Sequence, residues 1–433
     1  MAKHVIILGA GASKSSGYPL AAKSLGNPKP NDPSLREIPP LREILSSDDC
    51  FGKYVEKELG NLDSKGHVKE TLVGAFKSLL GTREGRLFQT TSYKTVDEFS
   101  FSLRNNQGYH ALVNQLKRFT SVVFAVHDPI RGQSNNQPDY VTFVQKLFNE
   151  QGHDLREDIS VLTYNYDPYL EFVLSGQFKN RREVAGRDSP KIPTALLSGF
   201  GDRDADGLLG GAGFCLLKLH GTSVLPCLDF LNPRVTSAAI DSILTFTNVF
   251  EDRSRLPNAL KGEAARPPMI SFPWERIAES GNFTRNDPRR ESEVFSLPLN
   301  CWKGRRKTSD HQLFRAIWLR GQREITDAEK ISFVGLQPHG FLAPGLQFLF
   351  KKRAEKLKAG DNMPLEVVTA NPDSVPEKYK GSSPPYNGHV DRLERMLREA
   401  CPNLTLADIP DGKRGLGSVA CYDDFASFIQ HEM

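Results

Sequence analysis

The stretch Val5–Ser13 reads VIILGAGAS, and it decides the fold expected for this chain. Four consecutive apolar residues, rich in β-branched side chains, are typical of a central parallel strand. The glycine-rich turn Gly9–Ser13 then leads into an expected helix. Glycines there let the backbone approach a phosphate, and the helix offers free N–H groups and the positive end of its dipole. The stretch predicts a dinucleotide-binding strand–turn–helix unit, with a tight turn that binds no ligand as the alternative.

The rest of the chain extends this pattern into a sheet. Further strands are predicted at 159–162, 214–219, 331–335 and 365–369, and helices at 168–174, 310–320, 342–357, 392–398 and 425–429. The alternation predicts an α/β fold: a Rossmann-like parallel sheet with helices on both faces. Between 35 and 150 the apolar residues follow helical spacing only, which predicts a large helical insertion after the first strand. We expect a single domain over 1–433, with a core at 1–25 and 155–433, a helical insertion at 26–154, and irregular insertions near 180–213 and 267–308.

The composition indicates an ordinary globular protein without strong attraction to nucleic acids or membranes. Of the 433 residues, 56 are Lys or Arg and 52 are Asp or Glu, a net charge of only +4. The most basic run, Lys303–Lys307, is interpreted as a solvated loop, and direct nucleic-acid binding is not expected. No apolar stretch reaches the roughly 18 residues of a membrane span. Six cysteines without a CxxC pair argue against a disulfide framework. A soluble, cytoplasmic protein is expected.

The glycine turn departs from two well-known nucleotide-binding patterns. Lys14 occupies the position of the third glycine in the dehydrogenase fingerprint, and no second strand with a terminal acidic residue follows within about 20 residues. These differences argue against hydride transfer. The chain also contains no Walker A sequence, which counts against an NTPase.

A second polar motif follows the predicted strand at 159–162. Thr163, Asn165 and Asp167 alternate along an extended segment, so their side chains are expected on one face. They lie at the carboxyl end of a strand, where open α/β sheets bind ligands. Asp167 precedes Pro168 and is equally well placed to cap a helix. Asp167 therefore has two readings, as cap and as ligand contact, whereas Asn165 is better explained as a ligand contact.

A third motif, Lys218–Thr222, places His220 and a glycine at the end of an apolar strand. An imidazole in that position has the chemistry of a general base near neutral pH. A structural histidine held by hydrogen bonds is the alternative. The combination with the two earlier motifs favours the catalytic interpretation.

In this order the three motifs resemble the sirtuin family, and in particular its zinc-free, SIR2-like branch found in bacterial defence systems. GAGAS with Gly17, Tyr18 and Pro19 is similar to the NAD-binding loop of that family. Thr163, Asn165 and Asp167 match its T-x-N-x-D motif, and His220 with Gly221 matches its HG. Gly335, after the strand ISFV, is similar to the position that contacts ribose. Asn371, in VVTANP, is similar to the asparagine presented to the adenosine half.

Two departures narrow what the resemblance implies. The chain lacks the paired CxxC motifs that bind structural zinc in sirtuin deacylases, so no metal is expected. Leu20 follows the loop where the family usually has Phe-Arg, and Tyr164 replaces a glutamine of the family. These changes count against protein deacylation.

The resemblance implies an NAD⁺ glycohydrolase that releases nicotinamide and ADP-ribose. NAD⁺ is then a substrate, with Asn165 and His220 as catalytic residues. The implied NAD⁺-binding residues are Gly9, Ala10, Gly11, Ala12, Ser13, Tyr18, Pro19, Thr163, Asp167, Gly335 and Asn371. By the same resemblance Asn165 binds ribose hydroxyls and orients water, and His220 takes a proton.

The resemblance also implies a biological setting and a means of control. It implies an effector of anti-phage abortive infection, controlled by homo-oligomerisation or by a separately encoded HerA-type ATPase or short Argonaute. The alternatives are an NAD-dependent deacylase or ADP-ribosyltransferase, a non-catalytic NAD- or ADP-ribose-binding module, and a DNA-associated subunit.

Overall fold

The computed structural model describes most of the predicted core and part of the insertions. The described residues are 4–16, 18, 41–59, 67–81, 86, 95–103, 109–127, 139–150, 155–167, 169–170, 173–174, 214–226, 268–272, 276–278, 294–296, 302–303, 306–307, 309–337, 342–371, 388–408, 415–416 and 418–433.

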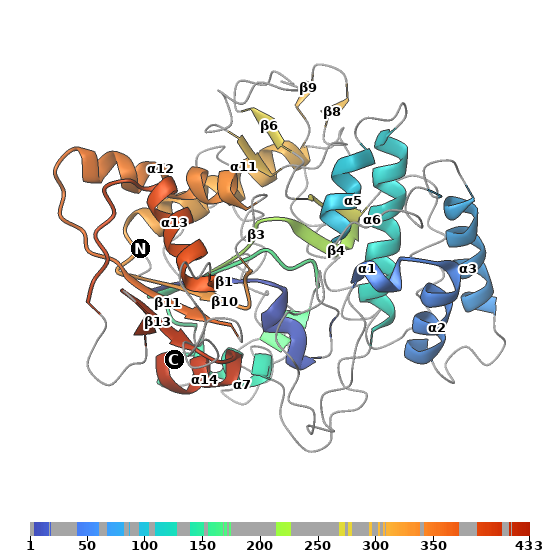
Figure 1. Ribbon diagram of the computed structural model, residues 1–433, viewed down its shortest axis with the longest axis horizontal. Helices are drawn as coiled ribbons and strands as arrows, with labels where there is room; N and C mark the ends of the chain where they lie inside the picture. Colours follow the sequence, from blue (N-terminus) through green and yellow to red (C-terminus); the bar gives the residue numbers. More distant parts are fainter. Residues whose placement is uncertain are drawn as a thin grey trace, which may run out of the picture.

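A twisted sheet forms the centre of the molecule (Figure 1). Its parallel strands in chain order are β1 (His4–Leu8), β2 (Ile159–Thr163), β3 (Cys215–Lys218), β10 (Lys330–Val334), β11 (Glu366–Ala370) and β13 (Val419–Tyr422). In the described part of the chain the strand order is β12-β13-β11-β10-β1-β2-β3. Only the edge strand β12 (Gly415–Leu416) is antiparallel. The predicted Rossmann-like α/β fold is therefore confirmed.

Strand β1 lies inside the sheet, and the strands that follow it in the chain are added first on one side of it and then on the other. From β1 the chain adds β2 and β3 on one side, and later β10, β11 and β13 on the other. Leu8, the last residue of β1, is paired with Val334 of β10 and with Thr163 of β2. Open α/β sheets bind ligands at such a switch point, beyond the carboxyl ends of the strands. The turns that follow these three strands are therefore where a ligand is expected.

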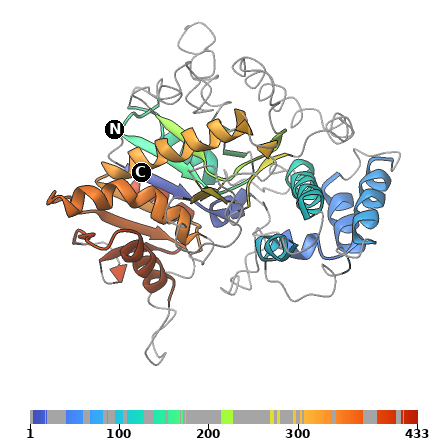
Figure 2. The same cartoon turned by 90° about the horizontal axis from the view of Figure 1, so that it is seen from above.

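Each face of the sheet has its own apolar core because successive strand residues point to opposite sides. Val5 and Ile7 pack with α11 (Ser309–Thr326), α12 (Ala343–Lys358) and α13 (His389–Ala400). Ile6 and Leu8 pack on the other side, where α7 (Asp139–Lys146), α14 (Phe425–Glu432) and the 3₁₀ helix η1 (Ala10–Ser16) lie. Figure 2 shows the helices α11 and α12 stacked over one face. The predicted helices at 310–320, 342–357, 392–398 and 425–429 are all present.

A separate group of helices, here called the helical unit, lies beside the sheet (Figures 1 and 2). It consists of α1 (Leu41–Ile44), α2 (Asp48–Leu59), α3 (His67–Leu80), α5 (Val96–Leu103) and α6 (Tyr109–Val126). Phe51, Phe76 and Phe119 meet in its centre with ring centroids 4.6–5.6 Å apart. The prediction of helices for this stretch is confirmed where the structure describes it. The last helix of the stretch, α7, instead packs on η1 and α14, against the sheet.

The prediction of an irregular insertion near 267–308 is wrong in part. This stretch contains the short strands β5 (Pro268–Ile270), β6 (Arg276–Ala278), β7 (Val294–Ser296), β8 (Trp302–Lys303) and β9 (Arg306–Lys307). Strand β5 pairs with β4 (Gly221–Pro226), and β6 pairs with β7. Strands of two or three residues have no apolar run that a sequence pattern can detect. The strand β13 was missed for a similar reason, since Val-Ala-Cys-Tyr is short and not rich in β-branched residues. The insertion predicted near 180–213 lies outside the described residues.

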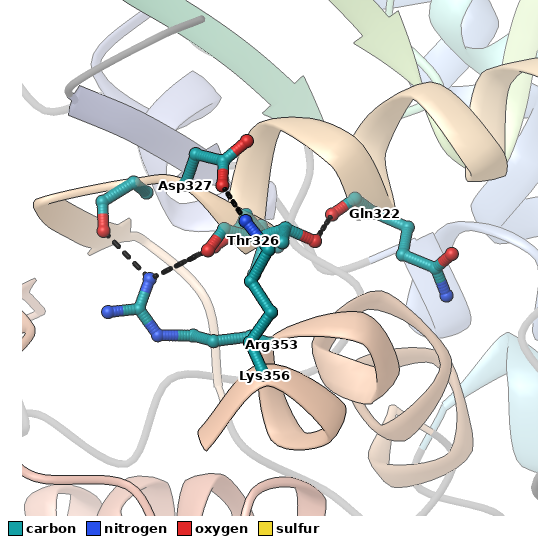
Figure 3. A network of polar contacts seen from close by, with 7 residues as sticks. Gln322, Thr326, Asp327, Arg353 and Lys356 are labelled. Atoms are coloured by element: carbon teal, nitrogen blue, oxygen red, sulfur yellow. Dashed lines mark hydrogen bonds and ion pairs between the residues drawn. The ribbon is translucent and has the colours of Figure 1, made fainter. Parts of the chain in front are cut away.

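At the amino-terminal edge of the sheet, a buried arginine joins two helices (Figure 3). The guanidinium of Arg353, on α12, donates to the carbonyl oxygens of Ile325, Thr326 and Ala328 at distances of 2.8–3.3 Å. These oxygens lie at and just beyond the end of α11, where backbone acceptors lack helical partners and the dipole favours a cation. One helix thus caps its neighbour.

No described helix is long and apolar enough to cross a membrane.

Candidate functional site

The glycines of the first turn make room for another piece of backbone. A Cβ added at Gly9 would lie 2.6 Å from the carbonyl oxygen of Gly335, and one at Gly11 would lie 2.7 Å from its Cα. Gly335 itself has φ of +61°, and an added Cβ would lie 2.1 Å from the backbone nitrogen of Ala12. All three glycines are therefore required by the contact between the turns that follow β1 and β10. The close approach expected for a phosphate is made, in this structure, to the chain itself.

This contact also occupies several of the backbone N–H groups expected to hold a diphosphate. Gly9 donates to the carbonyl oxygen of Val334 at 2.8 Å, and Gly11 donates to that of Gly335 at 2.9 Å. Ala12 donates to the carbonyl oxygen of Gly9. A ligand at this turn must therefore use other donors than these three.

Behind the turn lies a buried polar network centred on Ser13. The Ser13 hydroxyl donates to Oδ2 of Asp167 at 2.7 Å. It accepts from Nδ2 of Asn165 at 3.0 Å and lies 3.0 Å from the Tyr140 hydroxyl. Nδ2 of Asn165 also donates to the carbonyl oxygen of Gly9 at 2.9 Å. The network connects the turn after β1 to the turn after β2, and it fixes both relative to α7.

The donors and acceptors of this network determine which way the Asn165 amide points. A carboxylate only accepts, so the Ser13 hydrogen is directed to Asp167. Ser13 then offers its lone pairs to Asn165, and the carbonyl oxygen of Gly9 is also an acceptor. The amide must present its NH₂ group to these partners. Its oxygen, Oδ1, is left to accept hydrogen bonds from elsewhere.

Asp167 combines both roles that its sequence position allowed. Its Oδ1 accepts from the backbone N–H of Tyr169 at 3.3 Å, two residues ahead, as a capping side chain does. Its Oδ2 holds Ser13. The Asp167 side chain is only 3% exposed. Asp167 therefore holds Ser13 and the start of the segment after β2 in position.

His220 is presented by a sharp turn between β3 and β4. The next residue, Gly221, has φ of +76°, a conformation that favours glycine and explains the His-Gly pair. The imidazole lies among aromatic rings, 4.7 Å from Tyr164 and 6.2 Å from Tyr166 between ring centroids. The indole N–H of Trp318 donates to the carbonyl oxygen of Leu219 and so anchors the same turn. Burial raises the pKa of the neighbouring Tyr164 phenol, which keeps that ring uncharged.

One cavity connects these elements. It is lined by Gly9, Ala10, Ser13, Leu41, Val96, Asp97, Phe124, Tyr164, Asn165, Tyr166, Asp167, His220, Phe272, Leu336 and Leu342. Its volume is about 100 Å³, below the roughly 300–1,000 Å³ of pockets that hold a whole small-molecule ligand. The cavity is therefore too small to hold a whole ligand of that size. Asn165 and His220 both border it, next to the first glycine turn.

Six of the thirteen residues predicted for the site line this cavity: Gly9, Ala10, Ser13, Asn165, Asp167 and His220. Gly11, Ala12 and Gly335 take part in the backbone contact behind it. Thr163 accepts from the backbone N–H of Asn165 and shapes the turn after β2. Tyr18 packs on His127, the residue after α6, with ring centroids 4.3 Å apart. Pro19 lies outside the described residues.

Asn371, the remaining predicted residue, lies one strand farther along the sheet. Its Nδ2 is 3.4 Å from the carbonyl oxygen of Leu336. It therefore contacts the turn after β10 and does not border the cavity.

Sequence reasoning missed the wall opposite the sheet. Leu41, Val96, Asp97 and Phe124 come from the helical unit, whose periodicity indicated helices but gave no sign of which residues face the sheet. Phe272 follows β5, a strand that was not predicted. Tyr164 and Tyr166 lie within the T-x-N-x-D motif, and this was the one feature of the sequence that could have indicated that they border the cavity.

The described residues contain no cluster of three or more His, Cys, Asp or Glu side chains that could hold a metal ion. No protein-family model matches the chain, and no curated protein matches it. The family resemblance therefore rests on the motifs and on where the fold brings them.

Proposed function

We propose that this chain is an NAD⁺ glycohydrolase that cleaves NAD⁺ to nicotinamide and ADP-ribose. The observation that supports this proposal is the convergence of three distant motifs. The turn after β1, Asn165 after β2 and His220 after β3 all border one cavity at the carboxyl edge of the sheet. That edge is where open α/β sheets bind nucleotides.

In the proposed reaction, the bond between C1′ of ribose and N1 of nicotinamide breaks, and its electron pair leaves with the nitrogen. Water forms the new bond to C1′ and gives up a proton. Asn165 is suited to orient that water or a ribose hydroxyl, because its NH₂ group is held by Gly9 and Ser13 and its oxygen is the remaining acceptor. His220 is the general base that receives the proton. The apolar rings around it restrict competing water.

The small volume of the cavity and its lack of described basic side chains support the proposal that it binds only one half of the substrate. Among the lining residues that the structure describes there is no lysine or arginine, so nothing there favours a diphosphate. The nicotinamide–ribose half, which carries no negative charge, is therefore the part that we propose binds here. The diphosphate must then bind outside this cavity, using donors other than the N–H groups of Gly9, Gly11 and Ala12.

The test is to incubate the purified protein with NAD⁺ and separate the products by chromatography. We expect nicotinamide and ADP-ribose in equal amounts. His220→Ala and Asn165→Ala should each lower turnover by at least about 100-fold while circular dichroism stays unchanged. Wild-type turnover in either variant would contradict its catalytic role, and no NAD⁺ loss with bound nucleotide would favour a non-catalytic binding module.

A role in anti-phage defence and the need for a partner rest on the family resemblance alone. We propose them as its consequence: a chain that depletes NAD⁺ must be inactive until triggered. Self-association, a HerA-type ATPase or a short Argonaute would supply that control. Turnover measured over a range of protein concentrations tests the first of these, because activation by self-association makes specific activity rise with concentration.

A further inference from the structure

A residue outside the three motifs, Tyr140, reaches the candidate site from α7. Its side chain is buried, and its hydroxyl oxygen lies 3.0 Å from Oγ of Ser13 and 3.3 Å from Nδ2 of Asn165. The Tyr140 ring packs against other aromatic rings, with centroids 5.5 Å from Phe425 of α14 and 6.0 Å from Tyr169. These packed rings hold the hydroxyl beside Ser13 and Asn165.

The hydrogen positions in this group follow from Asp167. A carboxylate only accepts, so the single hydrogen of the Ser13 hydroxyl is directed to Oδ2 of Asp167 at 2.7 Å. The contact between Ser13 and Tyr140 then has the tyrosine as its donor. Because its own hydrogen is used in this way, the Tyr140 oxygen accepts from Nδ2 of Asn165. Asp167 thus orders a chain of hydroxyl groups that runs from Tyr140 through Ser13 to a carboxylate.

The oxygens around the Asn165 nitrogen therefore all act as acceptors. They are the carbonyl oxygen of Gly9 at 2.9 Å, Oγ of Ser13 at 3.0 Å and the Tyr140 hydroxyl at 3.3 Å. An amide turned end for end has nearly the same shape, so its hydrogen bonds select its orientation. These three acceptors attract the NH₂ group of Asn165 and repel its oxygen.

We propose that Tyr140 is a positioning residue that holds the amide of Asn165 with its oxygen left for the water or the ribose hydroxyl of the reaction. This inference rests on the proposed function and extends it to a residue that belongs to none of the three motifs. Tyr140 supplies one acceptor directly, and it fixes a second one by donating to Ser13. A misplaced amide impairs the geometry of attack more than the binding of substrate. Such a change lowers kcat and leaves KM nearly unchanged.

The first experiment compares Tyr140→Phe with Tyr54→Phe in steady-state hydrolysis of NAD⁺. Tyr140→Phe keeps the ring and removes only the hydroxyl. Tyr54→Phe is the matched control, because it removes another buried hydroxyl, one that donates to the carbonyl oxygen of Val123 in the helical unit and does not border the cavity. We expect Tyr140→Phe to lower kcat about tenfold, as the loss of one hydrogen bond does, with KM within about twofold. Tyr54→Phe should keep both constants.

Three results of these kinetics would overturn the proposal. The first is a kcat of Tyr140→Phe that stays within about twofold of wild type. The second is a higher KM at unchanged kcat, which would assign Tyr140 to substrate binding. The third is an equal fall of kcat in Tyr54→Phe, which would show a general response to the loss of a buried hydroxyl.

A second measurement does not depend on catalysis. In protein labelled with ¹⁵N in its asparagine side chains, the NMR signal of the Asn165 NH₂ group is identified by its loss in Asn165→Ala. We expect the hydrogens of this group to exchange with solvent at least about tenfold faster in Tyr140→Phe than in wild type, and at the wild-type rate in Tyr54→Phe. Unchanged exchange in Tyr140→Phe would overturn the proposal.

The two measurements distinguish a failure of this inference from a failure of the proposed function. If wild type does not hydrolyse NAD⁺, the proposed function fails, and faster exchange in Tyr140→Phe still supports the contact by which Tyr140 holds the amide. If wild type hydrolyses NAD⁺ and Tyr140→Phe changes neither kcat nor exchange, the proposed function stands and the role of Tyr140 is wrong.

Discussion

The two edges of the sheet both bury polar side chains, but they use them differently. At the amino-terminal edge, three buried polar side chains are paired with other parts of the chain. His4 bonds Ser332, Ser160 bonds Glu324, and Arg353 bonds carbonyl oxygens. At the carboxyl edge, Asn165 and His220 border a cavity. Burial of a polar residue therefore does not by itself indicate a site, and its position beside a cavity is the further observation on which the proposed site depends. The predictions below test this difference, beginning with the largest expected effect on stability.

The most sensitive position at the amino-terminal edge is Arg353. Arg353→Met keeps the apolar stem but leaves the carbonyl oxygens of Ile325, Thr326 and Ala328 without their shared donor. We expect the free energy of unfolding to fall by about 3–5 kcal/mol, measured by urea denaturation. Lys356→Met, one turn along α12, breaks only a surface ion pair with Asp327 and should cost about 1 kcal/mol or less. Similar losses for the two variants would show that the buried cap contributes little.

The glycine contact behind the cavity should be nearly as sensitive. Gly335→Ala adds a Cβ at 2.1 Å from the Ala12 nitrogen in a backbone with positive φ. We expect a loss of about 3 kcal/mol, combining left-handed strain with overpacking. Gly360→Ala is the control, because Gly360 also has positive φ but no atom within 4 Å of an added Cβ. Its loss should be about 1 kcal/mol. Equal losses in thermal or urea unfolding would contradict the packing role of Gly335.

Acid should destabilise the protein through the buried histidines of the core. Burial lowers the pKa of His4 to about 3, with a further contribution from Lys330, and burial lowers that of His389 to about 4. The unfolded chain binds these protons near pH 6.5. Stability is therefore complete above pH 6.5 and falls as the pH drops toward 4 for His389 and toward 3 for His4.

At pH 5 each of these two histidines should cost about 2 kcal/mol. His4→Gln keeps a hydrogen-bonding partner for Ser332 and should remove its share of the acid loss between pH 7 and 5, as should His389→Gln. Urea midpoints measured across this range check the effect. A slope that neither substitution reduces would assign the acid sensitivity to other groups.

The smallest effect on stability is expected where the effect on activity is largest. His220→Gln should change the free energy of unfolding by about 1 kcal/mol or less, because the side chain borders a cavity. NAD⁺ turnover should nevertheless fall by at least about 100-fold. Parallel unfolding and turnover measurements compare the two losses. A destabilisation as large as that of Arg353→Met would identify His220 as a structural histidine.

Much of the fold was predictable because it depends on patterns that are local in the sequence. Apolar runs as long as a strand predicted β1, β2, β3, β10 and β11. Such runs are continuous because both faces of a parallel strand are buried. Helical spacing gave α11 to α14 and the helical unit. The short strands β6 to β9 escaped detection, because two or three residues contain no period. The strand β13 escaped because it is short and not rich in β-branched residues.

The sequence by itself determined the chemistry of one side of the cavity. Glycine after β1, an amide after β2 and an imidazole after β3 stand at strand ends, and parallel strands bring their carboxyl ends to one edge. It could not tell that Gly9 and Gly11 adjoin Gly335, because a glycine is equally suited to a phosphate and to a neighbouring backbone. Nor could it place Leu41, Val96 and Phe124 of the helical unit at the same cavity as Asn165, since a helical period indicates a buried face but not its partner. Only the tertiary structure decided those contacts, because they join residues that are tens to hundreds of positions apart.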